Sequence, residues 1–391
     1  MNQNSLTLSD FYHQFPKADI HYHLLGGVRL GTMLDFARKY GVELPESEAK
    51  CFYRAHQHET GKMKGGIEAL TLLYSLMREP ADYFRVLVEV AEDAHACGVR
   101  YIETFWNPSD TAVNNAALDD QAINNLTINK PAMSYAAVTD ALSEAIDLVE
   151  REKGLIIRLI PSINREKSPE TAVKMVEEMI AYPHPYVLGI GIDYKEHNAE
   201  VEKFWKAYRL AQLHNYRLTA HCSEFGLHWR NVETGVELIE VDRIDHGYTI
   251  IENPALTEKY ANTGIPFTVV PSNTYYFRQW PEYQDWCRNH PIRAMAKAGL
   301  NITPCTDDWH IHNTTSANCY RVMVEDFGFD LDSIRQMMLN SINASWISEE
   351  QKQQWQTDWV NEFDSLRARL ISEPEIAPDQ LIQYRRSPNT E

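Results

Sequence analysis

The sequence contains no run of about 18 apolar residues, so it offers no segment long enough to cross a membrane as a helix. Its first residues, MNQNSLTLSDF, lack the basic segment and apolar core of a secretory signal. Dense runs of Lys and Arg are also missing, and 55 acidic against 37 basic residues give a formal net charge of −18. We therefore expect no nucleic-acid polymer and no membrane as partner, and a small molecule instead.

Cysteine is sparse, and its spacing is irregular. The chain has six cysteines, and no Cys-x-x-Cys element occurs. This distribution disfavours a disulfide framework and predicts reduced thiols in a cytoplasmic protein. Most of these cysteines are expected to be small buried apolar residues.

What the chain does contain is an alternation of strand-like and helix-like segments. Helix-like segments with apolar residues three and four apart lie between most of the strand-like runs. The strand-like runs, rich in Val, Ile and aromatic residues, span 18–24, 99–106, 155–161, 187–194, 217–222, 241–247, 266–271 and 300–308. Eight strands alternating with helices predict an α/β fold, the (β/α)8 TIM barrel.

Several segments are predicted to be additions to this barrel, which we expect to form a single domain over residues 1–391. Residues 1–14 are an N-terminal extension, and residues 40–80 are a helical excursion after strand 1. Residues 107–134, rich in Asn and Asp, are a long loop after strand 2 that we expect to cover the pocket. Residues 385–391 are expected to be a frayed tail.

Polar side chains recur where the apolar runs stop. They are His21, His23, Glu103, Asp193, His221, Glu224, Asp245, His246, Ser272, Asn273, Asp307 and Asp308. In this barrel, active sites are built at the carboxyl ends of the strands. The sequence therefore predicts an active site formed by this ring of residues.

The segment HYH at the end of the first run is the strongest single feature of the ring. Residues i and i+2 of a strand point to the same side, so His21 and His23 can direct two nitrogen donors at one point. His221 and Asp307 complete a ligand set of the kind that zinc takes, with one position left for water. A metal ion lowers the pKa of such a water molecule toward neutrality.

Three further residues complete a hydrolytic site. His246 is placed to take a proton from the water or to hold it by charge. Glu224, three residues after His221, is a candidate acid that protonates the substrate, and Asp308 is expected to hydrogen-bond the nucleophile or a substrate nitrogen. The set predicts metal-assisted hydrolysis at an sp² carbon.

Four motifs in order resemble the adenosine deaminase family of zinc aminohydrolases, within the amidohydrolase superfamily. They are HYHLLGG at the first strand, HCSE at 221–224, DHGY at 245–248 and TDD at 306–308. The resemblance runs from about residue 15 to about residue 345. It implies one zinc ion per chain, and hydrolysis of the 6-amino group of a purine nucleoside, converting adenosine to inosine and ammonia.

The resemblance also implies a role for each residue of the site. The zinc ligands are His21, His23, His221 and Asp307. Glu224 protonates purine N1, His246 orients or deprotonates the water, and Asp308 contacts N7 or the nucleophile. Gly26, Asp193, Glu196 and Asp308 are the implied substrate contacts.

The chain departs from the family pattern at positions that concern the substrate. Leu25 stands where the family usually has Asp or Glu, and Glu196 and Asp245 resemble the adenine-type branch instead. These departures keep open an alternative: the deamination of adenine, another aminopurine or an aryl amine. A nucleotide phosphate is disfavoured by the net charge unless Arg29 or Arg278 reverses it locally.

Two alternatives outside this reaction also stay open. A two-metal amide or phosphoester hydrolase of the same barrel needs a bridging lysine, for which Lys195 is the only candidate. A non-catalytic, ligand-binding member of the family is the other. Trp106 and Trp309 are candidate stacking platforms for a flat ligand, and Glu103 is expected to be structural. The sequence carries no prediction of oligomeric state.

Overall fold

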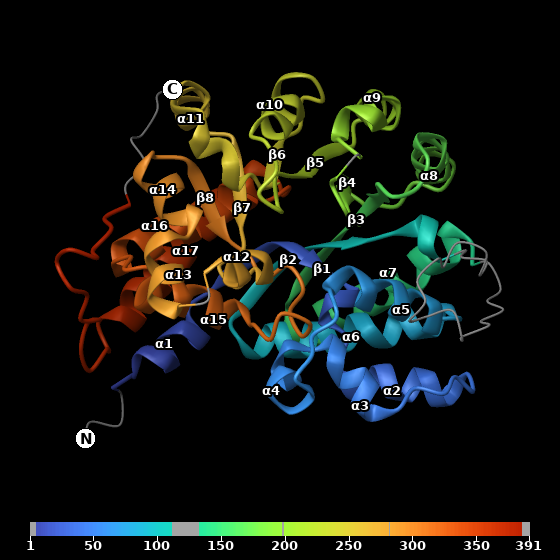
Figure 1. Ribbon diagram of the computed structural model, residues 1–391, viewed down its shortest axis with the longest axis horizontal. Coiled ribbons are helices and arrows are strands. Elements are labelled where there is room, and N and C mark those ends of the chain that lie inside the picture. The colour runs from blue at the N-terminus through green and yellow to red at the C-terminus, as the bar shows by residue number, and fades with distance from the viewer. Residues whose placement is uncertain (1–4, 112–132, 198, 281, 385–391) are drawn as a thin grey trace.

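The computed structural model describes residues 5–111, 133–197, 199–280 and 282–384. Its centre is a barrel of parallel strands that pair in the order β1 to β8, surrounded by helices (Figure 1). The strands are β1 (Lys17–His23), β2 (Val99–Trp106), β3 (Ile156–Asn164), β4 (Gly189–Asp193), β5 (Arg217–Cys222), β6 (Arg243–His246), β7 (Pro266–Val269) and β8 (Asn301–Pro304). The predicted (β/α)8 barrel is confirmed, and all eight strands fall within or across their expected runs.

The barrel closes between β1 and the segment that follows β8. The backbone N–H of His23 donates to the carbonyl of Asp307 (2.9 Å), and the N–H of Asp307 donates to the carbonyl of His21 (3.0 Å). Asp307 has a φ of 64° and therefore leaves the extended conformation, so the expected run cannot continue as a strand to residue 308. The strand itself ends earlier, at Pro304. The closure brings the HYH segment beside the TDD segment.

Helices cover the outside of the barrel. The longer ones are α2 (Leu30–Lys39), α5 (Gly66–Leu76), α6 (Pro80–Ala96), α7 (Tyr135–Lys153), α8 (Pro169–Ala181), α9 (Trp205–Leu213), α10 (Arg230–Glu237), α11 (Pro254–Thr263), α16 (Leu331–Ala344) and α17 (Glu349–Arg367). The shorter ones are α1 (Leu8–Gln14), α3 (Glu46–Ala49), α4 (Gln57–Thr60), α12 (Thr274–Gln279), α13 (Tyr283–Asn289), α14 (Pro291–Lys297) and α15 (Ser316–Arg321). Among the described residues, no helix combines the length and the hydropathy needed to span a membrane.

The predicted helical excursion after strand 1 is present as α3 to α5, together with short 3₁₀ turns at Lys50–Phe52 and Arg54–His56. The excursion matters for the pocket because it brings the first turn of α5 to the barrel mouth. Residues 107–111 leave β2 through a 3₁₀ turn, whereas residues 112–132 of the expected covering loop lie outside the described residues. The predicted tail at 385–391 lies outside them too.

The N-terminal extension includes a packed helix. The Phe11 ring of α1 lies edge-on to Phe363 of α17 (5.0 Å between centroids), and Phe15 packs in the same way on Tyr320 of α15 (5.0 Å). Leu6 pairs with Leu370 through a parallel bridge. These contacts fix the start of β1 against the last helices of the chain.

Glu103 lies within β2 and not at its end, which corrects the expectation that it belongs to the ring of strand ends. Its carboxylate pairs with Arg243 and accepts hydrogen bonds from the Tyr101 hydroxyl (2.7 Å) and the Trp346 backbone (2.6 Å). The pair is fully buried, and each charge has partners, as a buried charge requires. Glu103 is structural, as expected.

Candidate active site

Three histidines and one aspartate meet at the carboxyl end of the barrel. The Nε2 atoms of His21 and His23 each lie 3.1 Å from His221 Nε2, and Asp307 Oδ1 lies 3.3 Å from His23 Nε2. His21 Nε2 lies 3.7 Å from the same oxygen. One ligand atom from each residue fits within a 4.8 Å span, so the four predicted ligands are brought together.

The electrostatics of this group suit a cation. Burial lowers the pKa of His21 and of His221 well below the usual value, and lowers that of His23 to about 3, so the three imidazoles are neutral. Burial and then the charge of Asp308 raise the pKa of Asp307. Three facing nitrogen donors and a buried carboxylate form a set that a metal ion satisfies.

Asp245 orients two of these histidines from behind. Its Oδ2 lies 3.4 Å from His221 Nδ1, and its Oδ1 accepts a hydrogen bond from the Thr268 hydroxyl (2.7 Å). That hydroxyl lies 2.8 Å from His21 Nδ1. Because Thr268 donates its only proton to Asp245, it must accept from His21, so Nδ1 carries the proton and Nε2 presents its lone pair to the site. The sequence placed Asp245 in the ring of strand ends but gave it no role in orienting the histidines.

His23 has a comparable support. Its Nδ1 lies 3.7 Å from Asp193 Oδ2, and the other oxygen of Asp193 accepts a hydrogen bond from the Asn107 amide (2.7 Å). Asp193 therefore lies next to a predicted ligand and also borders the cavity. Burial raises the pKa of Asp193 to about 8.

The predicted acid and base lie on the other side of Asp307. His246 Nε2 is 3.7 Å from Glu224 Oε2 and 3.9 Å from Asp307 Oδ2. Burial, and then the charges of Glu196 and Asp308, raise the pKa of Glu224 well above the usual value, whereas burial lowers that of His246. Glu224 is thereby suited to hold a proton, and His246 is suited to accept one.

Strained backbone places several of these groups. Among the described residues other than glycine, those with positive φ include Tyr194, Ser223, His246 and Asp307, all at or just after strand ends around the cavity. In β6, side-chain alternation would direct His246 to the same side as Ile244, away from the barrel interior. A φ of 68° at His246 instead turns its ring toward His21, with ring centroids 4.7 Å apart.

Gly26 positions Asp308. A Cβ atom at Gly26 would lie 2.2 Å from Asp308 Oδ1, so no side chain fits there. The Gly26 carbonyl accepts hydrogen bonds from the backbone of His310 (2.8 Å) and Ile311 (3.3 Å), which holds the turn after Asp308. Burial raises the pKa of Asp308 to about 7.

Glu196, a predicted substrate contact, lies behind the loop that carries Glu224. Its carboxylate accepts hydrogen bonds from the backbone of Ser223 (2.8 Å) and Glu224 (3.2 Å) and from the Asn231 amide (2.7 Å). Glu196 is buried and does not border the cavity. The structure thus gives it the position of a residue that shapes the Glu224 loop.

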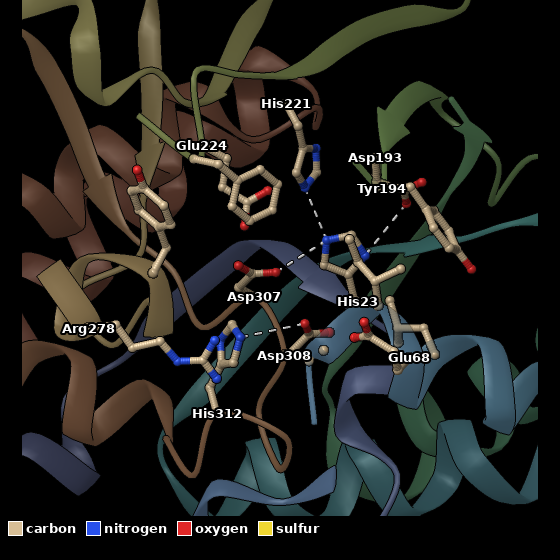
Figure 2. Close-up of a pocket in the computed structure, with 16 residues that line it drawn as sticks. His23, Glu68, Asp193, Tyr194, His221, Glu224, Arg278, Asp307, Asp308 and His312 are labelled. Atoms are coloured by element: carbon tan, nitrogen blue, oxygen red, sulfur yellow. Dashed lines mark hydrogen bonds and ion pairs between the residues drawn. The ribbon is translucent and has the colours of Figure 1, made fainter. Parts of the chain in front are cut away.

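Several of these groups border one cavity of about 180 Å³ (Figure 2). Figure 2 shows His23, His221 and Asp307 grouped together, with Asp308 between His312 on one side and Glu68 on the other. The cavity is bordered by His23, Gly65, Gly66, Ile67, Glu68, Leu70, Asp193, Tyr194, His221, Glu224, Phe225, Tyr275, Arg278, Asp307, Asp308 and His312. The sequence carried no signal for the residues of α5, since they lie in the excursion.

Several candidates from the sequence lie elsewhere. Trp106 is buried against Tyr135, and Trp309 is buried against Tyr22, so neither is a stacking platform in the cavity. The exposed Lys195 lies 3.9 Å from Glu166, outside the cavity. Arg29 is paired with acidic side chains of α6, whereas Arg278 borders the cavity. All six cysteines are free, and Cys97, Cys222, Cys305 and Cys319 are buried as expected.

Comparisons with known proteins agree with this arrangement. A family model described as Adenosine deaminase matches residues 16–361. The adenine deaminase of Rhodospirillum rubrum is 26% identical over 345 residues, which cover 88% of this chain and 95% of that protein. The adenine deaminase of Aspergillus fumigatus is 28% identical over 354 residues, which cover 88% and 94%.

Solved structures show the same barrel. An amidohydrolase from Burkholderia ambifaria, solved with bound Zn, has a TM-score of 0.84 and 38% identity, with 94% of this chain and 96% of that chain covered. The adenine deaminase of Arthrobacter aurescens has a TM-score of 0.74 and 21% identity, with 90% and 99% covered, and is similar in fold. The chain therefore belongs to the adenosine deaminase family, and this membership makes it a hydrolase that acts on a carbon–nitrogen bond.

Proposed function

We propose that this protein is a zinc-dependent deaminase that hydrolyses the 6-amino group of an aminopurine, leaving an oxo group and releasing ammonia. The observation that carries the proposal is the meeting, at the carboxyl end of the barrel, of the metal-competent group with Glu224 and His246, beside a cavity that Glu224, Asp307 and Asp308 border. The curated relatives named adenine deaminase support the aminopurine. The amidohydrolase solved with bound Zn supports the metal.

His21, His23, His221 and Asp307 would hold the zinc ion. When bound there, zinc supplies a Lewis acid that makes water a nucleophile at neutral pH. The chain itself supplies neutral imidazoles, each with one ring nitrogen free to bind, because burial keeps the proton off the second nitrogen. Asp245 and Asp193 keep the rings oriented from outside the ligand set.

Proton transfer is assigned to Glu224 and His246. Glu224 holds a proton at neutral pH and donates it to the ring nitrogen beside the reacting carbon, which makes that carbon more electrophilic. His246, neutral and facing the same point, accepts the proton of the attacking water. His246 passes this proton to the leaving amine, and the carbon–nitrogen bond breaks to release ammonia. The remaining hydroxyl proton returns to Glu224 as the oxo group forms. Asp308 hydrogen-bonds a second ring nitrogen or the nucleophile.

The cavity supports a small planar substrate. Ile67, Leu70 and Phe225 contribute apolar surface to its lining, and polar side chains, including His23, His221 and Asp307, contribute the rest. Adenosine is the expectation from the family motifs, and the relatives named adenine deaminase favour the free base as the second candidate. We also propose a cytoplasmic location, which the free cysteines support.

Ammonia release tests the proposal directly. The purified, zinc-loaded protein is assayed with adenine, adenosine, N6-methylated forms and AMP, beside a protein treated with a chelator and its zinc-reconstituted counterpart. We expect turnover of at least one member, loss of turnover on chelation and recovery with zinc. Absence of ammonia from every member, with one zinc bound per chain, contradicts catalysis and favours the non-catalytic, ligand-binding alternative. Two metals per chain would favour the amide or phosphoester hydrolase.

A further inference from the structure

One side of the cavity is cationic although the chain as a whole is strongly acidic. Arg278 of α12 borders the cavity and is exposed, and no described carboxylate lies within ion-pair distance of it. The second guanidinium, that of Arg54, comes from the excursion after β1 and donates to the Ser272 carbonyl (3.2 Å). Ser272 lies just before α12, so this hydrogen bond brings Arg54 to the segment that carries Arg278. Burial lowers the pKa of Arg54, and the charge of Arg278 lowers it further.

His312 adds a hydrogen-bonding group beside these cations. It is 5% exposed, and its Nδ1 has no hydrogen-bond partner within the described part of the chain. Its Nε2 lies 3.7 Å from Asp308 Oδ2. Figure 2 shows Arg278 extending toward the His312 ring, and the charges of Arg54 and Arg278 act, after burial, to lower the pKa of this imidazole. His312 is thus an imidazole that borders the cavity and whose Nδ1 still lacks a hydrogen-bond partner in the described part of the chain.

The opposite side of the cavity is acidic. Glu68, in the first turn of α5, lies across Asp308 from His312 (Figure 2). An anion in the cavity is repelled by Glu68 and attracted by Arg278, so only one side can receive it. A guanidinium is also a planar fork of donors that matches a phosphate or a carboxylate.

We propose that Arg278 determines specificity by binding an anionic group on the substituent of the aminopurine. The preferred substrate is then an aminopurine nucleotide or nucleoside acid, with its amino group at the metal and its phosphate or carboxylate at Arg278. His312 hydrogen-bonds the same substituent, and Arg54 adds long-range attraction. This inference rests on the proposed deamination and names its substrate class.

The test compares charged and neutral substrates on the zinc-loaded protein. Ammonia release gives kcat/KM for adenine, adenosine, AMP and adenosine 5′-carboxylic acid with the wild type, Arg278→Ala, Arg278→Lys and Arg288→Ala. Arg288 is an exposed arginine of α13 that does not border the cavity, and it serves as the matched control. We expect the wild type to favour an anionic substrate over adenosine at least about tenfold, as one charged hydrogen bond predicts.

The quantity that decides is the ratio of kcat/KM for the anionic substrate to that for adenosine. We expect Arg278→Ala to lower this ratio about 10- to 100-fold, Arg278→Lys to lower it less, and Arg288→Ala to match the wild type. A preference for AMP identifies phosphate, and a preference for the 5′-carboxylate identifies a carboxylate. Ammonia from neutral substrates with an unchanged ratio in Arg278→Ala overturns the inference alone. Absence of ammonia from all four substrates overturns the proposed function together with it.

Discussion

The variant Asp245→Asn isolates the contribution of a residue that touches the ligands but not the substrate. In the wild type, Asp245 accepts hydrogen bonds from the Thr268 and Thr219 hydroxyls, both at 2.7 Å. An asparagine has one acceptor oxygen where the aspartate has two. If its NH₂ faces Thr268, the Thr268 proton turns to His21 Nδ1, and the His21 proton moves to Nε2, where it blocks the lone pair. If its NH₂ faces His221 Nδ1, two donors oppose each other.

Either orientation weakens metal binding. Loss of an outer partner of a metal-binding histidine typically reduces affinity 10- to 100-fold, which is about 1.4 to 2.7 kcal/mol. The assay is zinc competition against a fluorescent chelator, with Asp242→Asn as the control. Asp242 lies just before β6, where it pairs with Arg217 away from the ligands (3.0 Å). An affinity within twofold of the wild type in Asp245→Asn would refute the assignment of Asp245 to orienting His21 and His221.

Three other predictions follow from single residues. Glu224→Gln should reduce kcat about 10²- to 10⁴-fold with zinc content unchanged, because the amide cannot donate the acid proton. Steady-state kinetics and metal analysis of the same preparation measure the two quantities. Near-normal turnover would exclude Glu224 as the acid. His246→Ala should likewise abolish turnover with zinc retained, and loss of zinc instead would make His246 a ligand. Burial lowers the pKa of His290, the N-cap of α14, to about 3. As the pH falls, the unfolded chain therefore binds a proton at this histidine before the folded protein does. The stability present above about pH 6.5 is lost as the pH falls toward 3. His290→Asn keeps a capping acceptor without this titration. Between pH 7 and pH 4, the free energy of unfolding of the variant should change less than that of the wild type, by up to about 1.4 kcal/mol per pH unit. Parallel pH profiles of the variant and the wild type in urea denaturation would contradict the assignment.

The strands and the metal-competent group could be predicted because they depend on local signals. Apolar runs with abrupt polar ends defined the strands, and HYH uses the two-residue period of a single strand. His221 and Asp307 came from separate strand ends, and the barrel topology brings such ends together. The acid–base pair followed from its place at the same ring of ends.

The remaining residues depend on geometry that no local pattern carries. Glu196 turns behind the Glu224 loop just after Tyr194, whose φ of 69° redirects the chain at the end of β4. Trp106 is the last residue of β2 and Trp309 follows the expected eighth run, yet both pack into the protein interior. Glu68 and Arg278 approach the cavity from an excursion and from a short helix after β7, and their spacing in sequence gives no indication that they face each other.

The measurement that tests the central claim most directly is product analysis in isotopically labelled water. The zinc-loaded protein is incubated with adenine, adenosine or AMP, ammonia is quantified, and the purine product is examined by mass spectrometry. The account predicts one ammonia per purine converted and one labelled oxygen in the product, because hydrolysis takes that oxygen from water. A protein that binds one zinc per chain yet yields neither ammonia nor labelled product from any of the three would contradict it.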